Sequence, residues 1–217
     1  MSDETRGSSP GPRSRRLALL VTGASGMELP RTLLRAAAAS PVVETIHLVV
    51  TAGASQVLRH ELDLTKPGAA ALVESAGLPG NEAAKIAVHS DRELDAPLAS
   101  GSYRLDGTVV LPCSGSTLAC LATGVSDRLV PRAGIVALKE RWPLILGFRE
   151  TPLSLVHLEN LRRMAYSGAI VLPPIPAFYV GGGNLARFLE AYALRVLDHL
   201  AIPGRRDDLR WPQTSGA

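Results

Sequence analysis

The chain has 217 residues, of which 46% are hydrophobic and 20% are charged. This length and composition are typical of one globular domain and exclude a wholly disordered chain. No run approaches the ~18 consecutive apolar residues of a membrane span, so we do not expect an integral membrane protein. The formal net charge is only +3 and aromatic residues make up 4% of the chain, a combination that disfavours nucleic-acid binding.

The two ends of the chain differ in composition from the middle. Residues 1–16 are rich in Ser, Pro, Gly and Arg and predict a disordered tail, and the apolar run after them is too short for a secretory signal. Residues 205–217 form a polar tail in which Trp211 is a candidate docking residue, against a neighbouring subunit or the active site. Cys113 and Cys120 match no zinc spacing, and as buried free thiols they indicate a cytoplasmic location. One α/β domain is therefore expected over residues 17–204.

Between the tails, short apolar runs alternate with segments of helical periodicity. The strands predicted from near-continuous Val, Ile and Leu runs are Leu17–Thr22, Ile46–Thr51, Thr108–Leu111, Leu144–Phe148 and Ala169–Leu172. The predicted helices are Leu29–Ala39, Ala54–Leu62, Ala69–Ala76, Thr117–Gly124, Ser154–Ser167 and Leu185–Leu200, the last capped by Asn184. Repeated alternation of strands and helices predicts a doubly wound parallel sheet.

In such a sheet, ligands bind beyond the carboxyl ends of the strands. The first of these turns, Thr22–Gly26, consists of small residues that allow a ligand to approach the backbone, and the helix after it offers N–H groups to a phosphate. A plain tight turn explains the segment equally well, because the full GxGxxG pattern is absent. The second strand ends in the hydroxyl residue Thr51, where an NAD enzyme needs a carboxylate for the ribose, so that class is disfavoured.

Two later turns also carry polar side chains. The third strand is followed by Ser114, Ser116 and Thr117, and because a helix cap uses only one hydroxyl, we interpret the group as a cradle for a phosphate or a polar ring. The fourth strand is followed by Arg149 and Glu150, a charged pair whose position favours a site over core packing. Taken alone, the charged run Leu138–Arg141 is interpreted as a solvated surface segment.

Taken in order, five segments resemble the UbiX-type flavin prenyltransferases. They are Gly23-Ala24-Ser25-Gly26, Leu111-Pro112-Cys113-Ser114, Leu138-Lys139-Glu140-Arg141, Arg149-Glu150-Thr151-Pro152-Leu153 and Pro173-Pro174-Ile175-Pro176-Ala177-Phe178-Tyr179. The resemblance extends from about residue 16 to residue 211. It implies a flavodoxin-like or Rossmann-like three-layer sandwich that binds FMN, needs no metal and forms a large homo-oligomer, commonly a dodecamer. The implied reaction joins a dimethylallyl group from dimethylallyl phosphate to N5 and C6 of reduced FMN, giving prenylated FMN for a partner decarboxylase.

The resemblance also implies roles for individual residues. The expected FMN-binding residues are Gly23, Ala24, Ser25, Thr51, Ser114, Gly115, Ser116, Thr117, Arg149 and Trp211. Lys139, Tyr179 and Arg195 are expected to bind the donor phosphate and to neutralise its charge as it leaves. Glu150 is the expected acid/base, assisted by Ser25 and Glu61. The aromatic face of Trp211 is expected to stabilise the allyl cation.

The chain departs from the family pattern at two places. Met27-Glu28-Leu29-Pro30 replaces the Ala-x-Tyr-Gly that commonly follows the first turn, and Glu28 repels a flavin phosphate unless it points outward. Ser116 stands where Lys, Arg or Asn is common, so one polar contact to the cofactor changes.

Two further classes of function stay open. One is an FMN-dependent decarboxylase acting on peptide or pantothenoyl cysteine, which usually depends on an active-site His and a Pro-x-Met-Asn-x-x-Met motif. Residues 173–176 lack that motif. The other is a non-catalytic flavin carrier or assembly subunit of a decarboxylase.

Overall fold

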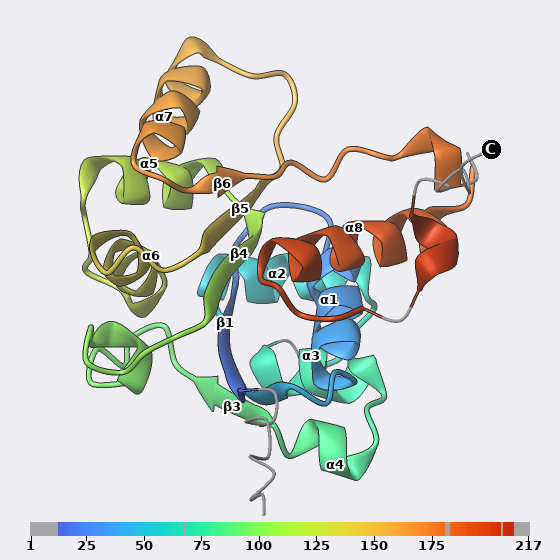
Figure 1. The fold of residues 1–217 in the computed structure, drawn as a ribbon. Coiled ribbons are helices and arrows are strands. Elements are labelled where there is room, and N and C mark those ends of the chain that lie inside the picture. The colour runs from blue at the N-terminus through green and yellow to red at the C-terminus, as the bar shows by residue number, and fades with distance from the viewer. Residues whose placement is uncertain (1–12, 67, 181–182, 205, 211–217) are drawn as a thin grey trace, which may run out of the picture.

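The computed structural model describes residues 13–66, 68–180, 183–204 and 206–210, which form an α/β domain around one parallel sheet (Figure 1). The strands are β1 (Arg15–Val21), β2 (Val43–Val50), β3 (Ile86–His89), β4 (Gly107–Cys113), β5 (Leu144–Phe148) and β6 (Ile170–Val171). Their order in the sheet is β3-β2-β1-β4-β5-β6, which is the strand order of the Rossmann fold. The predicted doubly wound, three-layer sandwich is confirmed.

Helices cover both faces of the sheet (Figure 1). One face packs against α1 (Glu28–Ala38), α2 (Ala52–Glu61), α3 (Ala69–Ala76) and α8 (Leu185–His199), and the other against α5 (Gly115–Thr123), α6 (Leu129–Lys139) and α7 (Leu155–Tyr166). The short α4 (Gly80–Ala83) precedes β3, and three 3-10 turns are η1 (Pro97–Ala99), η2 (Phe178–Val180) and η3 (Asp207–Leu209). Successive strand residues point to opposite faces. Leu19 therefore joins the core under α1 and α8, and Leu20 joins the core under α5 and α6.

The first strand begins earlier than the sequence predicts. Arg15 and Arg16 belong to β1 rather than to the N-terminal tail, because the buried Asp106 binds both: its carboxylate accepts hydrogen bonds from the Arg15 guanidinium at 3.4 Å and from the Arg16 backbone N–H at 3.0 Å. The first twelve residues of the predicted tail lie outside the described part of the chain.

Besides the short α4 and the 3-10 turns, helix α6 and strand β3 were not predicted from the sequence. Helix α6 buries Leu129, Val130, Ala133, Val136 and Ala137 at helical spacing. The exposed Lys139 and Glu140, interpreted as part of a surface run, are in fact its C-terminal end. Strand β3 lies at the edge of the sheet and is only partly buried, and its apolar run is three residues long, Ile86–Val88, shorter than any of the predicted strands.

The two cysteines differ in burial, and the described helices do not meet the requirements of a membrane span. Cys113 is buried as expected, whereas Cys120 on α5 is partly exposed, so the expectation of two buried thiols is only half right. Across the described residues, no helix combines the length and the apolar character that a bilayer span requires.

Candidate functional site

A buried threonine ties together the turns after β1 and β4. The Thr22 hydroxyl donates to the Pro112 carbonyl at 2.7 Å and accepts from the Ser114 N–H at 2.8 Å, and its residue is 1% exposed. The Arg149 N–H donates to the Cys113 carbonyl at 3.3 Å, which adds the turn after β5 to the same edge. The strand order reverses between β1 and β4, and ligands of doubly wound sheets bind at such a switch point. Sequence reasoning missed the role of Thr22, although a hydroxyl directly after an apolar strand is a usable signal.

A cavity of about 530 Å³ opens at this switch point. We call it the switch-point cavity. Its lining residues are Gly23, Val50, Thr51, Ala52, Gly53, Ser90, Asp91, Arg92, Ser114, Ser116, Thr117 and Arg128. The predicted FMN-binding residues among them are Gly23, Thr51, Ser114, Ser116 and Thr117. The structure thus brings together residues from the turns after three different strands.

Three helices begin at the switch-point cavity. Thr51 caps α2 by accepting from the Ala54 N–H at 3.2 Å, and Ser114 caps α5 by accepting from the Thr117 N–H at 3.3 Å. Both helices start two residues earlier than predicted, which is why these two hydroxyl residues stand at the caps. Arg128 occupies the cap position of α6. Because a helix N-terminus carries partial positive charge and free N–H groups, their convergence favours an anion such as phosphate.

The hydroxyl groups and backbone of the cavity fit a phosphate ester. The Ser114 hydroxyl lies 3.0 Å from the Thr117 hydroxyl and 3.2 Å from the Ser116 hydroxyl. A Cβ atom added to Gly23 would lie 3.1 Å from the carbonyl carbon of Gly53, so the absence of a side chain lets the two turns pack closely. Small turns of this kind let a ligand reach the backbone N–H groups.

Sequence reasoning missed the four lining residues with polar or charged side chains outside the predicted turns: Ser90, Asp91, Arg92 and Arg128. They come from the loop after β3 and the residue before α6, two elements that were not predicted. The Asp91 carboxylate accepts from the Val130 N–H at 3.0 Å, and its carbonyl accepts from the Leu129 N–H at 2.9 Å. Burial raises the pKa of Asp91 above its ordinary value. Asp91 therefore completes the N-terminus of α6.

A second group of predicted residues adjoins the first turn. Glu61 at the end of α2 accepts from the Gly26 and Met27 N–H groups, each at 2.8 Å. Burial alone would raise the pKa of Glu61, but hydrogen bonds from Met27, the Ser25 side chain and Gly26, with the nearby Arg149 charge, bring that pKa below its ordinary value. The Arg149 guanidinium donates to the Ser25 carbonyl at 3.1 Å. Ser25 thus binds both Glu61 and Arg149, and the three residues form one cluster.

The next residue, Glu150, is exposed, and its carboxylate accepts from the Thr151 N–H at 3.0 Å. Its position one residue beyond Arg149 places it at the edge of this cluster.

Glu28 lies away from the switch-point cavity, where it would have repelled a flavin phosphate. Glu28 is in an ion pair with Arg31 and lines a separate cavity between α1 and α8. It is absent from the lining of the switch-point cavity. Pro30 is the third residue of α1, an early position that tolerates proline.

Tyr179 and Arg195 line another cavity, of about 560 Å³, which we call the α8 cavity. Arg195 is exposed on α8, and Tyr179 belongs to η2. One wall of the cavity is formed by Leu209 and Arg210, which belong to the predicted C-terminal tail. The described part of that tail therefore lies against α8 of its own chain, whereas Trp211 falls outside the described residues.

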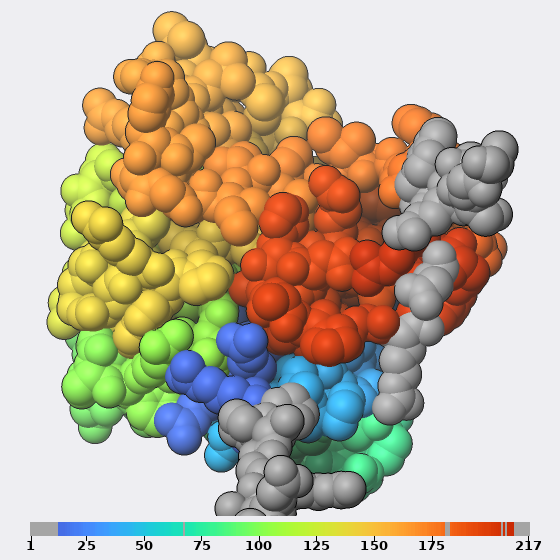
Figure 2. Space-filling view, in the orientation of Figure 1, coloured from blue at the N-terminus to red at the C-terminus, as the bar shows by residue number. Residues whose placement is uncertain are grey.

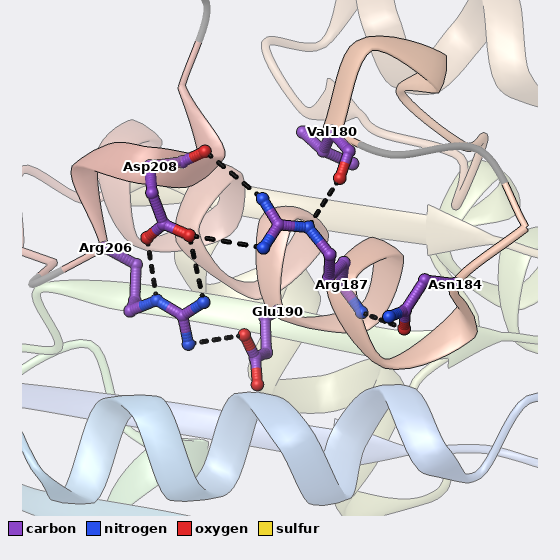
Figure 3. A network of polar contacts seen from close by, with 6 residues as sticks. All are labelled: Val180, Asn184, Arg187, Glu190, Arg206 and Asp208. Atoms are coloured by element: carbon purple, nitrogen blue, oxygen red, sulfur yellow. Dashed lines mark hydrogen bonds and ion pairs between the residues drawn. The ribbon is translucent and has the colours of Figure 1, made fainter.

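A polar network fastens this tail segment (Figure 3). The Asp208 carboxylate lies between two guanidinium groups, that of Arg206 at 2.9 and 3.1 Å and that of Arg187 at 3.4 Å. Arg206 also reaches Glu190 on α8 at 2.7 Å, and Arg187 donates to the Val180 carbonyl of η2 at 2.6 Å. The network therefore joins the tail segment, α8 and the turn that carries Tyr179.

Known proteins with similar sequences and structures decide the family. The sequence model of the Flavoprotein family matches residues 7–188. Mitochondrial flavin prenyltransferase PAD1 of Saccharomyces cerevisiae is 36% identical over 198 residues, which cover 91% of this chain and 76% of the relative. The chain belongs to the UbiX-type flavin prenyltransferase family.

Two solved structures resemble this flavin prenyltransferase in fold and sequence. The structure of AnUbiX (PadA1) in complex with FMN and dimethylallyl pyrophosphate has a TM-score of 0.78 and 36% identity, covering 93% of this chain and 99% of that chain. The dodecameric FMN-dependent UbiX-like decarboxylase of Escherichia coli O157:H7 has a TM-score of 0.77 and 34% identity, covering 91% and 99%.

One expected donor residue of this UbiX-type chain lies away from the others. Lys139 ends α6, where it pairs with Glu140 beside Gly101. An α-helix rises ~1.5 Å per residue, so Lys139 is roughly 16 Å along α6 from Arg128 at the switch-point cavity. Lys139 is not among the residues that line the α8 cavity with Tyr179 and Arg195.

Proposed function

We propose that this flavin prenyltransferase joins the dimethylallyl group of dimethylallyl phosphate to N5 and C6 of reduced FMN. The observation that carries the proposal is the convergence of three helix N-termini on a hydroxyl-lined cavity beside the Ser25–Glu61–Arg149 cluster. A cavity of this kind suits the phosphate of FMN. The bound FMN and dimethylallyl pyrophosphate of the AnUbiX relative support the same pair of ligands for this chain.

The polar turns divide the binding of FMN between them. Thr51, Ser114, Ser116 and Thr117 face the phosphate end, while Gly23 and Ala24 offer close backbone approach. Arg149 and Ser25 lie at the other side of the first turn, where we place the flavin ring. Reduced FMN supplies the electron-rich N5 and C6 atoms that bond to the dimethylallyl carbons.

The acid/base work falls to the carboxylates beside Ser25. Ring closure consumes the double bond of the dimethylallyl group, because one alkene carbon bonds to C6 while the other gains a proton. C6 then loses its own proton, and Glu150 is the proposed group that carries these protons. Because the pKa of Glu61 is lowered, its carboxylate is ionised at neutral pH. Glu61 therefore holds the Ser25 turn and presents negative charge rather than donating a proton.

Donor binding is assigned to Tyr179, Arg195 and Lys139. When the carbon–oxygen bond of the donor breaks, the electron pair leaves with the phosphate, and cationic groups stabilise the developing charge. Tyr179 and Arg195 share the α8 cavity. Lys139 ends α6 and does not line the α8 cavity, so we infer that it acts in the site of a neighbouring copy.

Assembly into a homo-oligomer satisfies this requirement. Helix α7 projects from the body of the molecule (Figure 2) and exposes apolar side chains, with Leu155 75%, Val156 66% and Tyr166 82% exposed. Such a surface is typical of a protein interface. The dodecameric E. coli relative supports the same arrangement. A decarboxylase that accepts the prenylated FMN, and a cytoplasmic location, remain predictions from the sequence.

The test is anaerobic incubation of the purified chain with reduced FMN and dimethylallyl phosphate, followed by mass spectrometry of the released flavin. We expect one added dimethylallyl unit, and its loss in Glu150→Gln and in Arg195→Ala with FMN still bound. Glu74→Gln, which changes an exposed carboxylate on α3, is the matched control and should keep full activity. Unmodified FMN with binding intact would favour the carrier alternative. Full activity of Glu150→Gln would remove only the acid/base assignment.

A further inference from the structure

We propose that Arg92 and Arg128 bind the phosphate of FMN across the switch-point cavity and make this chain selective for FMN over riboflavin. The proposal rests on the proposed function, because it takes FMN as the ligand of that cavity. It adds two residues that the sequence motifs do not mark, and it assigns them a role in specificity.

The two arginines reach the cavity from separate elements. Arg92 lies in the loop between β3 and η1, and Arg128 directly precedes α6. Both line the cavity together with the hydroxyl residues Thr51 and Ser114. The cavity therefore receives positive charge from its outer rim as well as from the helix N-termini at its base.

Neither guanidinium has a partner that would explain its position. Among the described residues, the Arg92 N–H donates to the Ser90 hydroxyl at 3.3 Å, but no ion pair or hydrogen bond engages the guanidinium group of Arg92 or of Arg128. Many other arginines of the chain do pair with carboxylates. They include Arg15, Arg16, Arg31, Arg162, Arg187, Arg206 and Arg210. Guanidinium groups left unpaired beside a polar cavity are available to an anionic ligand.

The single carboxylate in the cavity lining is engaged elsewhere. Asp91 lies within electrostatic reach of Arg128, but its carboxylate accepts from the Val130 N–H at 3.0 Å. It therefore holds the start of α6, and with it the position of Arg128, without closing an ion pair to either arginine. The charge balance of the lining residues is positive, with two arginines against one aspartate.

The neutral residue at position 116 adds no positive charge to the cavity. Ser116 in the first turn of α5 contributes a hydroxyl and no charge. The side-chain cations of the cavity are then Arg92 and Arg128. Arginine donates two parallel hydrogen bonds to phosphate oxygens. FMN and riboflavin differ only in that phosphate, so the two arginines act on the difference between them.

The experiment compares two ligands on the same variants. Dissociation constants for oxidised FMN and for riboflavin are measured by flavin fluorescence in wild type, Arg128→Ala, Arg92→Ala, the double variant and Arg128→Lys. Arg59→Ala, which removes an exposed arginine of α2 outside the cavity lining, is the matched control.

For FMN, we expect Arg128→Ala to weaken binding by roughly ten- to hundredfold, the usual effect of losing a charged hydrogen bond. Riboflavin affinity should stay unchanged, which also shows that the variant is folded. Arg128→Lys should recover part of the loss. An unchanged ratio of FMN to riboflavin affinity in the double variant would overturn this inference while leaving the proposed function intact. Failure of the wild type to bind either flavin would overturn both.

Discussion

The contact of Glu61 with the start of α1 makes a quantitative prediction for Glu61→Gln. The cap residue of α1, Met27, has no side chain that can accept a hydrogen bond, and the Glu61 carboxylate takes over that function from α2. Glutamine keeps one acceptor oxygen but loses the charge and the second oxygen, so the variant loses part of the ~1 kcal/mol of a helix cap together with the ~0.5 kcal/mol of a charge at a helix N-terminus. Since Glu61 is largely exposed to solvent, screening reduces this sum, and we expect a loss of about 1 kcal/mol.

The pH dependence of this loss follows from the pKa of Glu61. That pKa is lowered in the folded chain, so the stabilisation is complete above the unfolded value of ~4.3 and disappears as the pH falls through the folded value. Thermal unfolding at pH 7 should therefore show a melting temperature lower by about 2–4 °C in Glu61→Gln, for a domain of this size. Below pH 4 the difference should shrink toward zero.

Hydrogen exchange gives a local readout of the same contact. The Gly26 and Met27 amide protons should exchange faster in Glu61→Gln, whereas Glu74→Gln should leave them unchanged. Equal melting temperatures at pH 7, together with unchanged exchange at these two amides, would refute the capping role. A difference that persists undiminished in acid would refute the part played by the charge.

Three further predictions concern other contacts of the described chain. Thr22→Val should lower the free energy of unfolding by about 2 kcal/mol and weaken FMN binding, because two buried backbone partners lose their hydrogen bonds; Thr22→Ser is the control, and equal stability of both variants would contradict the reasoning. Asp208→Asn should raise the KM for the prenyl donor with FMN affinity unchanged, since it loosens one wall of the α8 cavity; a changed FMN affinity with normal KM would disprove it. His47 is 4% exposed, and burial, followed by the charges of His89 and Arg16, lowers its pKa from 6.5 to about 4. Up to about 3 kcal/mol of stability, present above pH 6.5, should therefore be lost between pH 6.5 and 4; urea unfolding across this range tests it, and an equally steep loss in His47→Gln would count against the assignment.

The central sheet was predictable because its strands are buried on both faces. Leu144–Phe148 has the predicted limits, and the other predicted strands differ from the observed ones only at their ends. Edge strand β3 was not predicted because its apolar run is only three residues long and ends at His89. Helix α6 was not predicted because the charged residues at its C-terminal end were interpreted as a surface run. The helical spacing of Leu129, Val130 and Ala133 is the signal that would have predicted it.

Site residues could be predicted from the sequence where several of them follow one strand in a single turn. Ser114, Ser116 and Thr117 follow one strand and stand together in the structure. Arg92 and Arg128 are 36 positions apart in the sequence and line one cavity only because β3 ends and α6 begins at the same edge of the sheet. No local pattern marks such residues.

Helix α6 has a consequence for mixed assemblies. The residue before its first turn, Arg128, lines the switch-point cavity of its own chain, while its last residue, Lys139, is proposed to serve the donor site of a neighbour. Under this proposal, one helix contributes to two catalytic centres. A chain that lacks Lys139 and a chain that lacks a residue of its own site, such as Arg149, should therefore complement each other. An assembly that combines Lys139→Ala chains with Arg149→Ala chains would contain some centres with both groups intact, and would regain activity that neither parent possesses.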